Sequence, residues 1–396
     1  MRYEIDIPAS KSMSNRLLML QHVLRQNVEI ENISTSTDTQ ILATALNTIQ
    51  TQKNATININ DCGTAFRFLT AYLCTQKGTW ILDGTERLRQ RPISDLVDAL
   101  LSIGADITYI NNIGFAPLKI NGKKLSFNHI DINAEKSSQF VSALMLILPL
   151  FEGEKTITFN HLTYSLQYIQ QTAALMQDLG IDIQLADNKI VYKGFYNTSA
   201  KKIKVENDWS SAAYWWGWVT LDPKISILLK DMHKSDYQKD SIIVDIVEQF
   251  GTDTRFLPDG ILIEKKVSSP VNNFLFDCHN NLDLVPLLAV VCVGTKTNAI
   301  LSHVGNLQYK ESNRIVALQT ELHDFASITF DGNNLIINTY KQEFPQQYSF
   351  SSHNDHRIAM SLALLKTKIK HLQIDNTECV NKSYPDFFRQ LENIEC

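Results

Sequence analysis

The chain has 396 residues, of which 44% are hydrophobic and 20% are charged, and its formal net charge is -5. This composition is typical of a globular protein, and the length predicts two domains or one large one. The negative charge argues against a protein that binds nucleic acid irrespective of sequence. Six scattered cysteines without a CxxC pair favour a reduced, cytoplasmic protein. The start carries no signal-peptide pattern, and the longest apolar runs are too short to cross a bilayer, so we expect no membrane partner.

Taken in chain order, two helix patterns alternate. One pattern has a small polar start followed by a strongly apolar run, which predicts a buried helix; it begins at residues 10, 61, 136, 208, 282 and 354. The other pattern has one polar face and often ends at Gly; it covers residues 39–49, 94–104, 169–180, 240–251, 313–325 and 385–394. After a shorter first interval, the buried helices start 72 to 75 residues apart.

Short β-branched runs between these helices, such as Thr56–Ile59, Lys155–Phe159 and Ser327–Phe330, predict strands. The chain is therefore predicted to be an α/β protein of six repeats, three per domain, each with one buried and one surface helix. The first repeat is short, since only 22 residues separate Asp38 from Asp61, and we expect it to lack a strand or loop. Several buried helices begin with small polar residues and a cation. Their free N–H groups would form an anion site if they faced one cleft.

Seven segments resemble, in the same order, the motif blocks of the enolpyruvyl shikimate phosphate synthases. They are Ser10–Arg16 (SKSMSNR), Asp61–Leu69 (DCGTAFRFL), Arg89–Leu100 (RQRPISDLVDAL), Lys136–Phe140 (KSSQF), Lys310–Arg314 (KESNR), Asn354–Met360 (NDHRIAM) and Lys382–Phe388 (KSYPDFF). The resemblance extends over residues 10–388 and implies the two-domain enolpyruvyl transferase fold, with six βαβαββ repeats. Residues 9–205 would form an N-terminal domain, mainly for shikimate 3-phosphate. Residues 1–8 and 206–396 would form the C-terminal domain, with the active site in the cleft between the two.

The resemblance also implies a function. An enzyme of this family transfers the enolpyruvyl group of phosphoenolpyruvate to the 5-hydroxyl of shikimate 3-phosphate and releases phosphate, by addition and elimination. The step belongs to the shikimate pathway, which supplies chorismate and the aromatic amino acids. We therefore expect two small-molecule substrates, no cofactor, no metal and a monomer.

The family's shikimate 3-phosphate ligands correspond to hydroxyls, amides and cations at the predicted helix starts. They are Lys11, Ser12, Arg16, Ser137, Ser138, Gln139, Ser165, Asp283, Asn306 and Lys310. An arginine offers phosphate a planar fork that lysine does not reproduce. Serines at such positions are also common helix caps, so the sequence alone leaves both interpretations open.

The family's phosphoenolpyruvate ligands correspond to a mainly cationic set: Lys11, Gly63, Arg91, Gln139, Arg314, Arg357 and Lys382. In the family the matching glycine lets the backbone approach phosphoenolpyruvate closely, although a tight turn would also require glycine. Lys310 and Arg314, four residues apart, are predicted to share one helix face. Their mutual repulsion there would be relieved by a bound anion.

Three residues are candidates for proton transfer: Asp283 as the base that accepts the hydroxyl proton, Glu311 as the acid for the methylene carbon, and Lys11. Which of them handles each proton stays open. We expect apolar walls around Asp283 to raise its basicity by desolvation.

Some residues depart from the family pattern. Asp61 and Cys62 stand where Asn-Ala is most common, and Asn313 stands where Asp is usual, so one charge fewer is expected there. These departures leave a non-catalytic shikimate 3-phosphate binding protein open as an alternative. The related transferase that acts on UDP-N-acetylglucosamine uses a catalytic Cys, which residues 85–92 lack. His353 and His356 alone are weak evidence for a metal.

Overall fold

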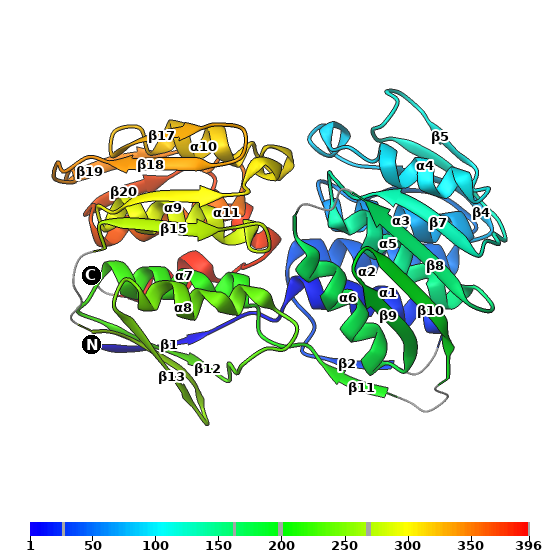
Figure 1. Ribbon diagram of the computed structural model, residues 1–396, viewed down its shortest axis with the longest axis horizontal. Coiled ribbons are helices and arrows are strands. Elements are labelled where there is room, and N and C mark those ends of the chain that lie inside the picture. Colours follow the sequence, from blue (N-terminus) through cyan, green and yellow to red (C-terminus); the bar gives the residue numbers. More distant parts are fainter. Residues whose placement is uncertain (26–27, 161–163, 197–200, 267–270, 395–396) are drawn as a thin grey trace. The chain divides into compact units, whose positions relative to one another are not determined.

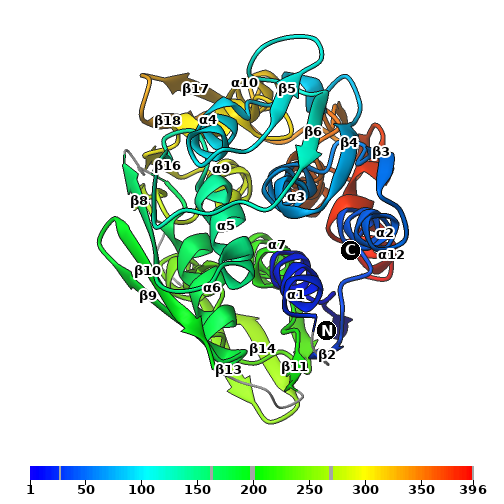
Figure 2. The same ribbon diagram turned by 90° about the vertical axis from the view of Figure 1, so that its right-hand side faces the viewer.

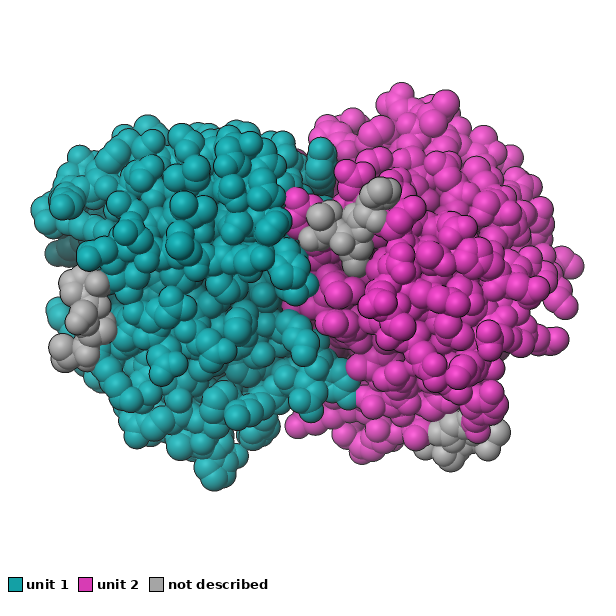
Figure 3. All heavy atoms as spheres, in the orientation of Figure 1, with its two compact units in different colours: residues 1–10, 206–396 teal, residues 11–205 magenta. Residues whose placement is uncertain are grey.

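The computed structural model describes residues 1–25, 28–160, 164–196, 201–266 and 271–394. They fall into two units, which Figure 3 shows in different colours: unit 1 is Met1–Ser10 with Glu206–Cys396, and unit 2 is Lys11–Val205. The chain therefore leaves unit 1 after Ser10 and returns to it after Val205. The sequence-based boundary after residue 8 lies two residues before the first of these crossings.

Unit 2 contains two complete βαβαββ repeats and one shorter repeat. In each complete repeat, two parallel strands continue into an antiparallel pair, giving the sheets β3-β4-β6-β5 and β7-β8-β10-β9. The first comprises β3 (Asn54–Asn58), α3 (Gly63–Thr75), β4 (Gly78–Asp83), α4 (Ser94–Ser102), β5 (Ile107–Tyr109) and β6 (Leu118–Gly122). The second comprises β7 (His129–Asn133), α5 (Ser138–Ile147), β8 (Lys155–Asn160), α6 (Leu166–Asp178), β9 (Ile181–Ala186) and β10 (Lys189–Phe195). The shorter repeat pairs β11 (Lys201–Lys204) in parallel with β2 (Val28–Glu31) and contributes α1 (Lys11–Leu24) and α2 (Thr37–Thr51).

Unit 1 follows the same plan. Its complete repeats form the sheets β1-β12-β14-β13 and β15-β16-β18-β17. The first comprises β1 (Arg2–Asp6), α7 (Trp209–Leu221), β12 (Ser226–Lys230), α8 (Ile243–Glu248), β13 (Thr252–Leu257) and β14 (Gly260–Lys265). The second comprises β15 (Asn273–Asp277), α9 (Val285–Gly294), β16 (Asn298–Ser302), α10 (Arg314–Glu321), β17 (Ala326–Phe330) and β18 (Leu335–Thr339). The shorter repeat has β19 (Gln347–Phe350), α11 (His356–Ala363), β20 (His371–Ile374) and α12 (Phe387–Glu392).

The predicted α/β fold with six repeats is confirmed, with one refinement: the two shorter repeats lack the final pair of strands. For the first repeat this agrees with its predicted shortening. The shortening of the last repeat was not predicted.

The helices that were predicted to be buried form the interior of each unit. Every residue of α7 except Ser210, and every residue of α9, is buried. Figures 1 and 2 show the strands of unit 2 lying around the outside of its helices. Gly104, Gly180 and Gly251 end the surface helices with positive φ of 88°, 86° and 78°, as expected for helix C-termini. None of the helices formed by the described residues is long and apolar enough to span a membrane.

Within each complete repeat of unit 2 the buried helix starts shortly after the first parallel strand ends. In unit 2, β3 ends at Asn58 and α3 begins at Gly63, while β7 ends at Asn133 and α5 begins at Ser138. The free N–H groups and the positive dipole ends of α3 and α5 therefore lie at the carboxyl ends of the parallel strands. That edge of each sheet is where α/β proteins usually bind ligands.

Candidate active site

In unit 2, the first turn of α1 carries Lys11 and Ser12 and is tied to two neighbouring helices. Lys11 Nζ lies 3.1 Å from Asp38 Oδ2, at the start of α2. Arg16 donates from Nη1 to Ser12 O at 2.9 Å and from Nε to Thr172 Oγ1, on α6, at 2.7 Å. The predicted placement of these three cationic and hydroxyl residues on the first turns of a helix is thus confirmed.

Arg16 is 2% exposed, and its guanidinium also donates from Nη2 to Tyr168 O at 3.3 Å. These bonds use three of its five N–H donors. All three acceptors are uncharged oxygens, so burial lowers the pKa of Arg16 to about 10. An anion beside this buried cation would relieve that cost.

A second group lies at the start of α3. A Cβ atom on Gly63 would fall 2.2 Å from Arg91 Nη1 and 2.4 Å from Arg67 Nη1, so both guanidinium groups converge on the glycine. Arg67 donates to Gly63 O at 2.9 Å and to Pro92 O at 3.4 Å, which ties α3 to the segment that carries Arg91. Two cations close to the positive end of a helix favour a negatively charged ligand.

A third group lies at the start of α5. Ser137 is the N-cap, and its Oγ accepts from Gln139 N at 3.2 Å. Gln139 Nε2 donates to Thr64 Oγ1, on α3, at 3.3 Å, so the starts of α5 and α3 adjoin. Ser138 is buried.

Ser165 is the residue before α6 and has a left-handed backbone conformation, with φ of 63°. A non-glycine residue rarely adopts this conformation, and it often does so at functional sites. The Ser165 side chain is buried and makes no cap bond to its own helix.

In unit 1, Asp283 is shared by two arginines from different helices. Its Oδ1 lies 3.0 Å from Arg314 Nη1, and its Oδ2 lies 3.0 Å from Arg357 Nη2. Asp283 belongs to the 3-10 helix η4 (Leu282–Leu284), which leads into α9, whereas Arg314 begins α10 and Arg357 lies in the first turn of α11. The structure thus brings together three predicted site residues at three helix starts.

Asp355 binds the side chain of Arg314 and the backbone of Arg357, and it was not predicted as a site residue. Its fully buried carboxylate accepts from Arg314 Nε at 2.8 Å and Nη2 at 3.2 Å, and it caps α11 by accepting from Arg357 N at 2.9 Å. It also accepts from the backbone N–H and the hydroxyl of Ser312. Burial acts to lower the pKa of Arg314, but Asp355, Glu311 and Asp283 together raise it above its ordinary value.

The expected rise in the basicity of Asp283 is wrong for this state of the chain. Burial does act to raise the pKa of Asp283, but Arg357, Lys310 and Arg314 outweigh it and hold that pKa below its ordinary range. Asp283 is therefore a carboxylate held by cations, and its weak basicity lasts only as long as those cations stay paired with it.

Glu311 adjoins this cluster, since its Oε2 lies 2.8 Å from Arg314 Nη2. The prediction that Lys310 and Arg314 share a helix face is wrong, because Lys310 follows the 3-10 helix η5 (Gly305–Tyr309) and α10 begins only at Arg314. Asn306 lies in η5, and Lys382 ends the 3-10 helix η7 (Thr377–Lys382), which packs on α11. Both side chains are mostly buried.

The residues that depart from the family pattern have local roles. Cys62 caps α3, where its Sγ accepts from Ala65 N at 3.4 Å, and Asn313 caps α10 by accepting from Val316 N at 3.2 Å. His353 Nε2 lies 2.6 Å from Glu321 Oε1. No group of three His, Cys, Asp or Glu suited to a metal ion occurs among the described residues.

Sequence reasoning missed Asp38, Arg67, Thr172 and Asp355. Asp355 and Arg67 lie inside the motif segments 354–360 and 61–69, so a test of every polar residue in those segments would have found them. Asp38 and Thr172 lie outside all seven segments and carry no such signal.

Comparison with known proteins gives consistent results. The family model for EPSP synthase (3-phosphoshikimate 1-carboxyvinyltransferase) matches residues 1–391. A 3-phosphoshikimate 1-carboxyvinyltransferase of Bacteroides fragilis (strain YCH46) is 34% identical over 98% of this chain and 94% of its own length. One from Shewanella denitrificans is 30% identical over 99% of this chain and 96% of its own.

Solved structures share the fold at lower identity. An EPSP synthase from Acinetobacter baumannii has a TM-score of 0.76 at 20% identity, with 99% of this chain and 95% of that chain covered. The enolpyruvyl transferase NikO from Streptomyces tendae has a TM-score of 0.72 at 14% identity, with 99% and 94% covered.

Proposed function

The chain belongs to the EPSP synthase (3-phosphoshikimate 1-carboxyvinyltransferase) family, and we propose that the residue clusters described above bind its two substrates and catalyse their reaction. The enzyme transfers the enolpyruvyl group of phosphoenolpyruvate to shikimate 3-phosphate, a step of aromatic amino-acid biosynthesis. The alternative of a transferase for UDP-N-acetylglucosamine is wrong, because the family model that matches nearly the whole chain is that of EPSP synthase.

Shikimate 3-phosphate is proposed to bind mainly through the helix starts of unit 2. Buried Arg16 supports this, because its hydrogen-bond partners are uncharged oxygens and a bound anion would offset the cost of burying its charge. Backbone N–H groups in the first turns of α1 and α5 add further donors for phosphate oxygens. The proposed ligands are Lys11, Ser12, Arg16, Ser137, Ser138, Gln139, Ser165, Asp283, Asn306 and Lys310.

Phosphoenolpyruvate carries a carboxylate and a phosphate, so its proposed ligands are mostly cations. The convergence of Arg91 and Arg67 on Gly63 supports an anion at that point, where the absence of a side chain leaves the backbone accessible. The proposed ligands are Lys11, Gly63, Arg91, Gln139, Arg314, Arg357 and Lys382. Arg67 positions the segment next to Arg91 by binding the backbone oxygens of Gly63 and Pro92. Asp355 positions the other two arginines by binding the Arg314 side chain and the backbone N–H of Arg357.

The observation that carries the mechanism is the sharing of Asp283 by Arg314 and Arg357. Phosphoenolpyruvate competes with Asp283 for these two guanidinium groups. Once the negative charges of the substrate offset these two guanidinium groups, only Lys310 still opposes the effect of burial, and the pKa of Asp283 rises. Asp283 thus becomes an effective base only when phosphoenolpyruvate is bound.

The same displacement acts on Glu311, whose carboxylate pairs with Arg314 in the free chain. Losing that partner favours its protonated form, the form that can act as an acid. Glu311 then protonates the methylene carbon, which builds positive charge on the neighbouring carbon. The 5-hydroxyl oxygen bonds to that carbon and passes its proton to Asp283. The bond from that carbon to the phosphate oxygen then breaks and its electron pair leaves with phosphate. A methyl proton returns to the Glu311 carboxylate, and the double bond forms again. Lys11 remains the alternative carrier of one of these protons.

Phosphate release tests this proposal. Release should require both substrates together and should fall by about 10³-fold in Asp283→Ala, the usual range for loss of a general base. Asp259→Ala, at an exposed turn of unit 1, is the matched control and should retain activity. Activity of Asp283→Ala within threefold of the unchanged chain would refute the assigned base. No release by the unchanged chain, despite calorimetric binding of shikimate 3-phosphate, would support the non-catalytic alternative.

We further propose that the chain acts in the cytoplasm as a monomer. A reducing compartment is supported by the cysteines that form no disulfide, namely Cys62, Cys74, Cys278, Cys292 and Cys379. Light scattering of the purified chain at assay concentration measures its mass directly, and twice the 45.0 kDa of one chain would contradict the monomer.

A further inference from the structure

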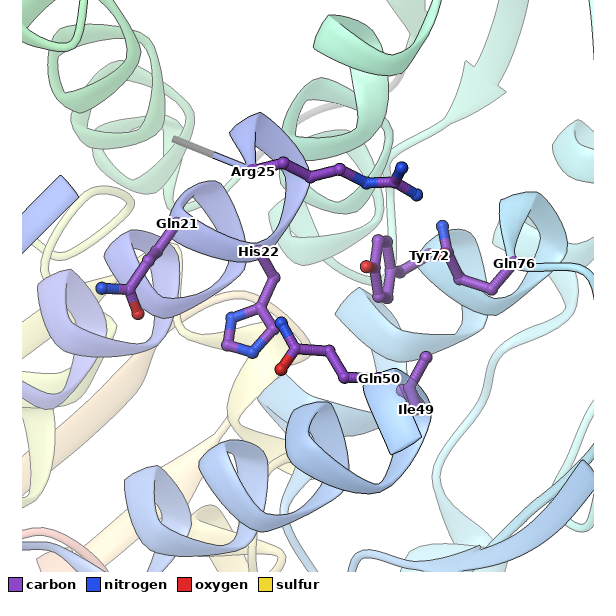
Figure 4. Close-up of a pocket in the computed structure, with 7 residues that line it drawn as sticks. All are labelled: Gln21, His22, Arg25, Ile49, Gln50, Tyr72 and Gln76. Carbon is purple, nitrogen blue, oxygen red and sulfur yellow. The ribbon is translucent and has the colours of Figure 1, made fainter. Parts of the chain in front are cut away.

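A pocket of about 660 Å³ lies at the carboxyl ends of three helices of unit 2 (Figure 4). It is lined by Gln21, His22 and Arg25 from α1 and the residue after it, Ile49 and Gln50 from α2, and Tyr72 and Gln76 from α3 and its end. Its volume lies within the range of roughly 300–1,000 Å³ that is typical of small-molecule sites.

This pocket is separate from the residues proposed above to bind substrate. Those residues occupy the opposite ends of α1 and α3, at Lys11, Ser12 and Gly63. With 14 residues, α1 spans about 20 Å at a rise of roughly 1.5 Å per residue. A ligand in the pocket would therefore not occupy the substrate-binding ends of these helices.

Among the described residues that line the pocket, Arg25 is the one lysine or arginine. Its side chain is exposed, and within the described part of the chain no ion pair or hydrogen bond engages its guanidinium. The Arg25 charge also acts on the buried Tyr72: burial raises the pKa of that phenol, and Arg25 acts to lower it. A guanidinium binds a carboxylate through two parallel hydrogen bonds.

The remaining polar groups can both donate and accept hydrogen bonds. His22 Nδ1 lies 2.9 Å from Leu18 O, which can only accept, so Nδ1 carries the proton and Nε2 of the neutral ring is an acceptor. Gln76 uses Nε2 to bind Thr75 Oγ1, which leaves its Oε1 as a further acceptor. The Gln50 amide and the Tyr72 hydroxyl offer donors, and Ile49 adds an apolar wall.

The charges at the helix ends and on Arg25 indicate which ligand charge the pocket favours. The carboxyl ends of α1, α2 and α3 carry partial negative charge, and α2 and α3 have no basic residue in their last turns. A single cation in such a place suits one negative charge and disfavours a dianion such as phosphate. We propose that this pocket binds a small organic monocarboxylate, with its carboxylate on Arg25 and a neutral remainder that donates and accepts hydrogen bonds.

N-acetyl-L-phenylalanine has these properties and is the probe. Its binding is followed by ligand-observed NMR with the full chain saturated with shikimate 3-phosphate. We expect a Kd on the order of 1 mM, which is reasonable for a ligand of this size. N-acetyl-L-phenylalaninamide, which lacks the carboxylate, and phenyl phosphate should each bind at least about tenfold more weakly, as the loss or mismatch of a charge-assisted hydrogen bond predicts.

Variants locate the binding. Arg25→Gln should weaken it about tenfold or more, whereas Arg2→Gln, at an exposed arginine on β1, should leave it unchanged. Arg25 takes no part in the proposed chemistry, so Arg25→Gln should keep the phosphate-release kcat and thereby show that it is folded. The proposal is overturned if the probe does not bind, if Arg25→Gln binds it equally well, or if phenyl phosphate binds more tightly.

Discussion

Replacing Gly63 by alanine should disrupt phosphoenolpyruvate binding while leaving the fold intact. The added Cβ would lie 2.2 Å from Arg91 Nη1 and 2.5 Å from Arg91 Cζ, closer than non-bonded atoms can approach. Gly63 is the first residue of α3, where alanine itself is well tolerated. The clash is therefore expected to move the Arg91 guanidinium rather than to unfold the helix.

To reach ordinary contact distance, that guanidinium must retreat by about 1 Å or more. A displacement of this size breaks a charge-assisted hydrogen bond, which contributes roughly 1.5–3 kcal/mol. The KM for phosphoenolpyruvate should therefore rise by about 10- to 100-fold. The KM for shikimate 3-phosphate should change by less than about threefold, because Arg91 is not among its proposed ligands.

Steady-state phosphate release at varied concentrations of each substrate measures both constants. The contribution of Arg91 is isolated by a double-mutant cycle: in an Arg91→Ala background, Gly63→Ala should have a clearly smaller effect, because only the contact of 2.4 Å between the added Cβ and Arg67 Nη1 remains. Two results would refute the reasoning. One is a KM for phosphoenolpyruvate that Gly63→Ala leaves unchanged, and the other is an effect as large in the Arg91→Ala background as in the unchanged chain.

Three further predictions concern the buried charges. Asp355→Asn should lower the free energy of unfolding by about 3 kcal/mol, because it weakens the pairing of buried Arg314. The same change should raise the KM for phosphoenolpyruvate. An unchanged midpoint of urea unfolding would contradict this. The acid limb of the pH profile of kcat/KM, which reports the free enzyme, should lie below the ordinary aspartate pKa of about 3.9. The acid limb of the kcat profile should lie at higher pH, because bound phosphoenolpyruvate takes the cations from Asp283. Acid limbs at the same pH would count against this displacement of Asp283 by the substrate. Arg16→Lys should weaken calorimetric binding of shikimate 3-phosphate at least about tenfold, because lysine cannot reproduce the forked contacts; unaltered affinity would remove Arg16 from the ligand set.

The six repeats could be predicted because the information that defines them is local. A helix such as α9, apolar on every face, indicates its own burial regardless of what surrounds it. The helix ends marked by Gly104, Gly180 and Gly251 likewise depend only on the last turn of one helix. The missing final strands of the last repeat were not predicted, because the segment after β20 was interpreted only as a helix.

The charge network of unit 1 was less predictable, because it depends on contacts between distant segments. Arg314 and Asp355 are 41 residues apart, and no local pattern indicates that their side chains meet. The pKa direction of Asp283 was predicted wrongly for the same reason. Its apolar neighbours are visible in the sequence beside it, whereas the approach of Arg357 is a property of the folded unit.

The pairing of β1 with β12 limits the order in which the two units can fold during synthesis on the ribosome. β1 is synthesised before unit 2, yet its partner Ser226–Lys230 follows only after all of unit 2. Unit 2 can complete its sheets as it emerges, since every strand in them comes from residues 28–204. Until β12 appears, β1 remains an unpaired strand held beside a folded neighbour. Its charged residues Arg2, Glu4 and Asp6, which alternate with apolar ones, would help to keep that strand from associating with other nascent chains.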